Sequence, residues 1–176
     1  MPTLNVFGIE PESIVDGPGL RYAIFVQGCT HKCPGCHNPE SQPHTPNNSM
    51  DVDDIFKDIM SRKLVGGVTF SGGEPFEQPE ALASLAKKLK NEGISIWCWS
   101  GYLYEDIVKD EAKSQLLKYV DVLVDGPFVL AKKSMGCSWR GSTNQRLIDV
   151  AKSSPDNIVE WAENDPLAKF TKPASW

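Results

Sequence analysis

The sequence lacks the features that mark exported, membrane and nucleic-acid-binding proteins. No apolar stretch approaches the roughly 18 residues that a membrane-spanning helix needs. Residues 1–5 carry neither the positive charge nor the apolar run of a signal peptide. Lysine and arginine form no cluster, and the net charge of the 176 residues is −5. We therefore expect a cytoplasmic protein that binds neither nucleic acid nor a membrane surface.

Cysteine is also scarce, and most of it is in one place. The chain has 5 cysteines. Because this number is odd, at least one cysteine is left out of any set of disulfides within the chain. Three of them, Cys29, Cys33 and Cys36, follow one another with the spacing C-x₃-C-x₂-C. A loop this short can turn three thiolates toward one point, which suits a metal centre. A thiol cluster without an export signal is typical of a reducing cytoplasm.

Two kinds of metal centre compete for these thiolates. Structural zinc takes four ligands in a closed tetrahedron, usually as two separated pairs, and neither a second C-x₂-C nor an H-x₃-H lies nearby. A 4Fe–4S cluster normally takes four cysteines, so three would leave one iron open to a substrate. The triplet therefore favours iron–sulfur over zinc, and three unmetallated thiols are the remaining alternative.

The apolar pattern of the chain predicts strands that alternate with helices. Runs of branched and aromatic residues predict strands over residues 20–27, 66–70, 94–99 and 120–124. Apolar residues at helical spacing predict helices over 52–60, from Pro79 to Gly93, and over 104–119 with an interruption at Asp110. We further expect an edge strand over 4–9, a polar loop over 41–49 whose Ser49 caps the next helix, and a last strand over 147–150.

This alternation is typical of parallel βαβ units, in which ligands gather beyond the carboxyl ends of the strands. About four to six strands are too few to close an eight-stranded barrel. We therefore predict an α/β fold, a partial, open (β/α) barrel of parallel strands, over residues 1–151. Residues 152–176 form a tail of unknown role, with Ile158, Val159 and Trp161 as its obvious packing residues.

Four unusual segments sit at the ends of the predicted strands and are expected to converge. They are the cysteine loop, Ser71-Gly72-Gly73-Glu74-Pro75, Ser100-Gly101-Tyr102 and Asp125-Gly126-Pro127. The Gly-Gly-Glu-Pro segment has two interpretations. It is either a plain turn, or a binding site. In a binding site the paired glycines let the backbone approach a ligand, and the carboxylate accepts hydrogen bonds from an ammonium group of that ligand.

The cysteine triplet together with the later Gly-Gly-Glu-Pro resembles the radical S-adenosylmethionine (SAM) superfamily. In that superfamily three cysteines hold a 4Fe–4S cluster whose fourth iron binds the amino and carboxylate groups of SAM. The resemblance implies that the cluster ligands are Cys29, Cys33 and Cys36. It implies that Gly35, Cys36 and His37 lie beside SAM and that its amino-acid end is held by Gly72, Gly73 and Glu74. Many members have an aromatic residue where this chain has Gly35, so the adenine contact there is expected from the backbone.

Residues 15–21 (Val-Asp-Gly-Pro-Gly-Leu-Arg) are similar to the glycyl-radical-enzyme activases. Among these activases, the chain most resembles the proteins that activate anaerobic ribonucleoside-triphosphate reductase. The segments that carry this resemblance are residues 99–102, 122–126 and 139–146. The resemblance implies reductive cleavage of SAM to a 5′-deoxyadenosyl radical, which takes hydrogen from a glycine of the reductase. It implies an external one-electron reductant such as flavodoxin or ferredoxin. Further candidates are Ser100 and Asp125 for the SAM side and Asp16 and Arg21 for the partner's glycine loop.

Each of the remaining candidates has a plainer alternative. Asp125 could only cap a turn, and Asp16 and Arg21 could be a turn residue and a surface cation. Cys98 is expected to be a small buried thiol. Cys137 is expected to be a plain loop residue, and a reactive thiol or a fourth ligand is the less favoured alternative. The histidines His31, His37 and His44 are not expected to be acid–base catalysts, because the cofactor supplies the chemistry.

Two alternative functions stay open on the sequence alone. One is a radical SAM enzyme that acts on a small molecule, such as a deazaguanine-forming synthase. The other is a non-catalytic zinc-binding module.

Overall fold

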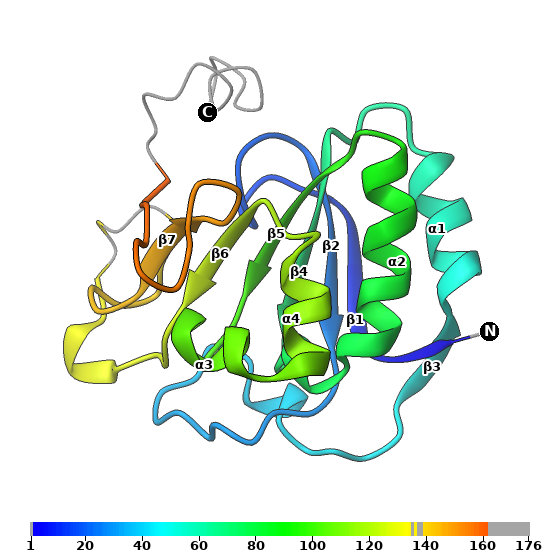
Figure 1. Cartoon of the computed structure of the whole chain (residues 1–176). Coiled ribbons are helices and arrows are strands. Elements are labelled where there is room, and N and C mark those ends of the chain that lie inside the picture. Colours follow the sequence, from blue (N-terminus) through cyan, green and yellow to red (C-terminus); the bar gives the residue numbers. More distant parts are fainter. Residues whose placement is uncertain (1, 135, 137–138, 162–176) are drawn as a thin grey trace.

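The computed structural model describes residues 2–134, 136 and 139–161. A seven-stranded sheet runs through it in the order β3-β1-β2-β4-β5-β6-β7 (Figure 1). The strands are β1 (Thr3–Ser13), β2 (Arg21–Val26), β3 (Asn48–Asp51), β4 (Gly67–Gly72), β5 (Ser95–Trp99), β6 (Val122–Asp125) and β7 (Arg146–Asp149). The helices are α1 (Val52–Met60), α2 (Pro79–Asn91), α3 (Tyr104–Lys109) and α4 (Glu111–Leu117).

The centre of the sheet is parallel, as the alternating pattern predicts. Strands β2, β4, β5 and β6 pair in parallel, whereas β1 and β3 on one side and β7 on the other pair antiparallel to their neighbours. The sheet remains open, because its outer strands β3 and β7 do not pair with each other. The prediction of an open, partial α/β barrel is confirmed.

The start of the chain differs from the prediction in two ways. Strand β1 is not an edge strand, because it pairs with β2 on one side and β3 on the other. Strand β3 falls at the end of the segment expected to be a loop, and its last residue, Asp51, takes the capping role expected of Ser49. The Asp51 side chain accepts a hydrogen bond from the Asp53 amide at 2.7 Å, which satisfies one free N–H of the first turn of α1.

The predicted break near Asp110 is confirmed and has a local cause. Asp110 is extended, and its carboxylate accepts a hydrogen bond from the Lys113 amide at 3.0 Å. One helix therefore ends before Asp110 and a second starts after it. The helix from Pro79 is also confirmed, with proline at its first turn and Gly93 at a φ of +73° just after its end.

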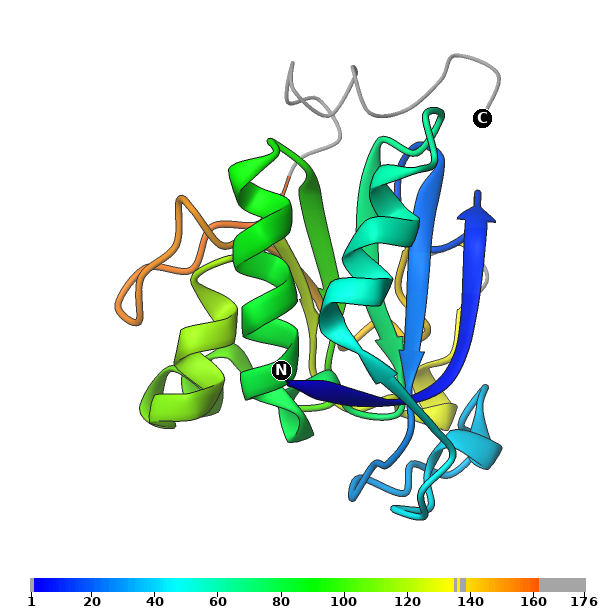
Figure 2. The same ribbon diagram turned by 90° about the vertical axis from the view of Figure 1, so that its right-hand side faces the viewer.

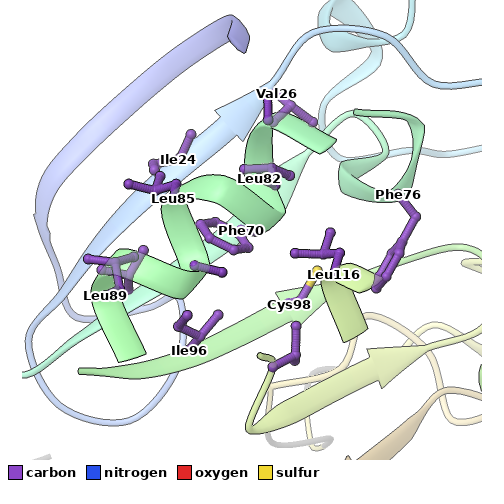
Figure 3. Close-up of a cluster of buried hydrophobic side chains, with 14 of the residues drawn as sticks. Ile24, Val26, Phe70, Phe76, Leu82, Leu85, Leu89, Ile96, Cys98 and Leu116 are labelled. Atoms are coloured by element: carbon purple, nitrogen blue, oxygen red, sulfur yellow. The ribbon is translucent and has the colours of Figure 1, made fainter. Parts of the chain in front are cut away.

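The main core lies between the helices and one face of the sheet, and Figure 2 shows α1 and α2 side by side on that face. Leu82, Leu85 and Leu89 of α2 point onto the strands (Figure 3). They meet a buried strand layer formed by Ile24, Val26, Phe70, Ile96 and Cys98. Each buried leucine contributes about 1.5–3 kcal/mol. Cys98 is a buried thiol, as predicted, and burial raises its pKa well above the ordinary value.

The segment after β7 packs back onto the sheet. The Asp149 amide donates to the Val159 carbonyl at 2.9 Å, and the Trp161 amide donates to the Leu147 carbonyl at 2.8 Å. Ile158 packs against the main core, and the ring of Trp161 lies 4.9 Å from that of Trp97. Among the described residues, no helix has the length and apolar character needed to cross a membrane.

Candidate functional site

A cavity of about 510 Å³ lies where the strand-end loops meet. Side chains alternate along a strand. Phe25, Ser71 and Trp99 line the cavity, whereas the residue before each of them belongs to the core beneath the helices. The loops that follow β2, β4, β5 and β6 all contribute to its wall, which confirms that these segments converge. The predicted site residues in the lining are Asp16, Cys29, Cys33, Cys36, His37, Gly72, Gly73, Glu74 and Ser100.

The cysteine loop is anchored at its base. The Gly28 amide donates to the Ser41 carbonyl at 2.6 Å, and the Cys29 amide donates to the Gln42 carbonyl at 2.9 Å. Cys29, Cys33 and Cys36 are each partly buried and form no disulfide. Burial raises the pKa of the Cys29 thiol to about 11, so a metal must displace its proton on binding.

Gly35 lies outside the cavity lining, and the structure explains why it is glycine. Its φ is +74°, and a Cβ added there would lie 2.7 Å from Cδ1 of Leu130. An aromatic residue before Cys36 would therefore need both a strained backbone and a displaced Leu130. The contact of Gly35 with SAM stays a prediction.

The donor chemistry of the three cysteines fits an iron–sulfur cluster. Three unpaired thiols face one cavity, and within the described residues no three His, Cys, Asp or Glu side chains converge tightly enough for a single metal ion. A cluster places its cysteine ligands around several iron atoms. Cys137, the candidate fourth ligand, lies outside the described residues.

The paired glycines permit a close approach of the chain to itself. The Gly73 amide donates to the Val26 carbonyl and the Glu74 amide to the Gly28 carbonyl, both at 2.8 Å. A Cβ added to Gly73 would lie 2.3 Å from the Gly28 carbonyl oxygen. Both glycines also line the cavity. The turn after β4 is thus fixed directly against the first residues of the cysteine loop.

Glu74 joins three strand-end loops at the cavity wall. It is only 1% exposed. One carboxylate oxygen accepts hydrogen bonds from Ser100 Oγ at 2.8 Å and the Phe76 amide at 3.0 Å. The other accepts from the Gly101 amide at 2.8 Å and lies 2.7 Å from His31 Nε2. A carboxylate offers about four acceptor positions, so all those of Glu74 are used within the protein.

Comparison with known proteins assigns the family. A family model described as "4Fe-4S single cluster domain" matches residues 15–148. A protein from Vibrio cholerae is 36% identical over 151 residues, and one from Escherichia coli K12 is 35% identical over 153; each alignment covers 81% of this chain and 96% of the relative. A protein of phage T4 is 37% identical over 153 residues, covering 82% of this chain and 93% of the relative. All three are named anaerobic ribonucleoside-triphosphate reductase-activating protein. The chain belongs to this family.

One solved structure, QueE from Escherichia coli, shares the chain path over 70% of each chain, with a TM-score of 0.47 and 14% identity. This likeness is too weak to add to the assignment. The sequence relatives alone place the chain among the reductase-activating proteins.

The family segment 15–21 has an internal role that the sequence does not reveal. Arg21 is 1% exposed, and burial lowers its pKa to about 9. Its guanidinium donates to Thr69 Oγ1 at 2.9 Å, to the carbonyls of Pro18, Val68 and Ser95, and to Ser95 Oγ. The prediction that Arg21 contacts the partner is wrong, as is its alternative, a surface cation. Arg21 instead ties the turn before β2 to β4 and β5.

Asp16 remains at the cavity, in contrast to Arg21. It lines the cavity wall beside Val15, which is 75% exposed. Its carboxylate accepts a hydrogen bond from Ser13 Oγ, and its carbonyl accepts one from Thr69 Oγ1 at 2.6 Å. Arg21 holds the same Thr69 hydroxyl, so the buried arginine positions the exposed turn.

The prediction that Asp125 contacts SAM is wrong, because its side chain is fully buried away from the cavity. Its carboxylate accepts a hydrogen bond from the Tyr104 amide at 2.8 Å, at the start of α3. It also pairs with Arg146, whose Nε lies 3.0 Å away. Asp125 therefore supports the start of α3 and holds β7 in place, a structural role that differs from the turn cap given as its alternative.

The sequence reasoning missed two parts of the site. The first is the aromatic wall, where the indole of Trp99 donates to the Trp139 carbonyl at 2.8 Å and the ring centroids of Phe128 and His37 lie 4.9 Å apart. The family resemblance of residues 139–146 is the signal for this wall, but it assigns no role to Trp139. The second is the contact between His31 and Glu74, for which the sequence carries no signal because the two residues are 43 positions apart.

Replacing Gly73 with alanine is expected to destabilise the fold by about 1–3 kcal/mol, because the new Cβ would overlap the Gly28 carbonyl. The same displacement would move the base of the cysteine loop, so the iron content after reconstitution should also fall. Urea unfolding and iron analysis measure the two effects. Gly8→Ala is the matched control, since a Cβ at Gly8 meets nothing within 4 Å. Equal stability of the two variants would contradict the close approach.

Proposed function

We propose that this protein activates an anaerobic ribonucleoside-triphosphate reductase by generating its glycyl radical. The observation that carries the proposal is the shared cavity of the three cysteines and the Gly-Gly-Glu turn. It occurs in a chain that is 36% and 37% identical to relatives that carry the activating name. The target reductase is inferred from these names.

In this proposal Cys29, Cys33 and Cys36 bind a 4Fe–4S cluster and leave one iron open to SAM. When bound, the cluster supplies one electron that cleaves SAM to methionine and a 5′-deoxyadenosyl radical, which takes hydrogen from a glycine Cα of the reductase. A flavodoxin or ferredoxin is the class of external donor we expect for that electron.

The turn after β4 is proposed to hold the amino-acid end of SAM. Gly72 and Gly73 present backbone to the cavity, and Glu74 supplies a buried negative charge at its wall. Its acceptor positions are used by protein donors. We therefore infer that Glu74 attracts the ammonium group of SAM by its charge and by fixing the loops. Ser100 supports the same carboxylate, and His37 lies at the Phe128 wall.

The remaining cavity residues are proposed to shield the reaction and to receive the partner. The aromatic rings of Phe128, Trp99 and Trp139 line the same cavity as the cysteines and would exclude water from the reacting atoms. Asp16 and the exposed Val15 lie at the cavity on the turn that Arg21 fixes. We assign to Asp16 the contact with the glycine loop of the reductase.

A labelling experiment tests this function. The reconstituted protein is incubated without oxygen with SAM, a one-electron reductant and a reductase that carries deuterium on its glycine Cα atoms. We expect equal amounts of methionine and 5′-deoxyadenosine, with deuterium in the 5′-deoxyadenosine. An active reductase together with unlabelled 5′-deoxyadenosine would refute direct hydrogen transfer, and SAM cleavage that leaves the reductase inactive would point to a small-molecule substrate.

A further inference from the structure

His31, which lies between two of the cysteines, links the cysteine loop to the loops that follow β4 and β5. Its side chain is 17% exposed, so most of it is enclosed by protein. Its Nε2 lies 2.7 Å from Glu74. Its ring meets Tyr102 edge to face, with ring centroids 4.5 Å apart. One imidazole therefore touches both neighbouring loops.

The His31 ring fits against the backbone of Gly101 because glycine has no side chain. A Cβ added to Gly101 would lie 2.5 Å from the His31 ring, so the ring rests directly against the backbone after β5. Glu74 fixes the same backbone through the Gly101 amide at 2.8 Å. Glu74, Gly101 and Tyr102 thus form a socket for one side chain of the cysteine loop.

His31 holds a part of the cysteine loop that the hydrogen bonds at its base do not reach. The base of the loop, at Gly28 and Cys29, is held by backbone hydrogen bonds to Ser41 and Gln42. His31 sits two residues beyond Cys29 and two before Cys33. Its hydrogen bond goes to a carboxylate, and bonds of that kind are stronger than those between neutral groups.

We propose that His31 is a positioning residue that holds the tip of the cysteine loop against Glu74 and so sets the placement of Cys29 and Cys33 before a cluster binds. The inference rests on the proposed function only in treating these cysteines as cluster ligands. The contact needs neither SAM nor a partner, so it can be tested on the protein without them.

The test measures the accessibility of each thiol in reduced, metal-free protein under anaerobic conditions. Alkylation by iodoacetamide is followed by mass spectrometry for wild type, His31→Ala, His31→Gln and His44→Ala. In His31→Ala we expect Cys29 and Cys33 to react on the order of tenfold faster, because the loop opens more often once the bond to a charged group is lost. Glutamine can donate from a similar position, so His31→Gln should stay close to wild type.

His44→Ala is the matched control. His44 also pairs with a glutamate, Glu77 at 3.1 Å, but its side chain is 55% exposed and lies outside the cavity lining. The His44 ring lies against Gly28, at the base of the cysteine loop, so its removal could affect Cys29 but should leave the rate of Cys33, beyond the His31 contact, unchanged. Buried Cys98 reports on the whole fold and should stay unreactive in all four proteins.

A second readout uses the loaded protein without any turnover. The loss of visible absorbance in the presence of an iron chelator should be faster in His31→Ala than in wild type and should be largely restored in His31→Gln. Equal thiol rates in His31→Ala and wild type would overturn the proposal, and so would a general rise that includes Cys98. If the thiol rates change as expected but no reductase is activated, the proposed function fails and the positioning role stands.

Discussion

Replacing Cys36 with alanine is expected to abolish the cluster and SAM cleavage while leaving the protein folded. The partly buried thiol lies on a loop outside the core and accepts a hydrogen bond from the Asn38 amide at 3.4 Å. Its loss should change the free energy of unfolding by no more than about 0.5 kcal/mol. Mutation of residues that only hydrogen-bond to metal ligands typically reduces metal affinity or activity by about 10–100-fold. Loss of the ligand Cys36 itself should reduce cluster content and SAM cleavage by more than this.

The measurements are the visible absorbance after reconstitution, the iron content, and the yield of 5′-deoxyadenosine. Cys98→Ala is the matched control, because Cys98 is buried in the core beneath the helices. It should lose about 1 kcal/mol of stability and keep its cluster. A Cys36→Ala protein that retains a full cluster and cleaves SAM at the normal rate would contradict the ligand assignment.

Replacing Arg21 with alanine is expected to destabilise the protein by about 3 kcal/mol or more. The substitution leaves the buried carbonyls of Pro18 and Val68 and the partly buried carbonyl of Ser95 without their present donor. Each unsatisfied buried group costs about 1–3 kcal/mol. Lysine should not rescue the stability, because its three donors on one atom cannot reproduce the spread of a guanidinium. Urea unfolding of Arg21→Ala and Arg21→Lys measures the effect.

Arg62→Ala is the control for loss of an arginine at a partly exposed site. Arg62 pairs with Asp58 at 3.1 Å, four residues away, and such pairs contribute less than about 1 kcal/mol. If Arg21→Ala kept normal stability and lost only affinity for the reductase, the structural role of Arg21 would be incorrect. The prediction that Arg21 contacts the partner would then be supported.

The sequence predicts the parts of the fold that depend on local pattern. Continuous apolar strands, the helix from Pro79 and the break at Asp110 all follow from residues that act within a few positions of each other. Strand β3 is polar and short, and it exists because β1 offers an edge for pairing. A pairing of this kind is set by tertiary structure, which a single segment does not reveal.

The sequence likewise predicts one part of the candidate site and misses another. The cysteine spacing and the Gly-Gly-Glu segment are visible in the sequence, and the structure brings them to one cavity. The charged residues are harder to interpret, because burial decides their roles. Arg21 and Asp125 occur in segments that resemble the family, yet both are enclosed and support other residues. Their supporting roles follow from contacts between distant parts of the chain.

The most direct test is electron spin resonance of the reconstituted protein mixed without oxygen with SAM, a one-electron reductant and the anaerobic reductase. Our account predicts a doublet from a glycyl radical that depends on SAM and on Cys36, and that collapses toward a singlet when the glycine Cα carries deuterium. The absence of this doublet, with an intact cluster and a reductase that a known activating protein can activate, would contradict it.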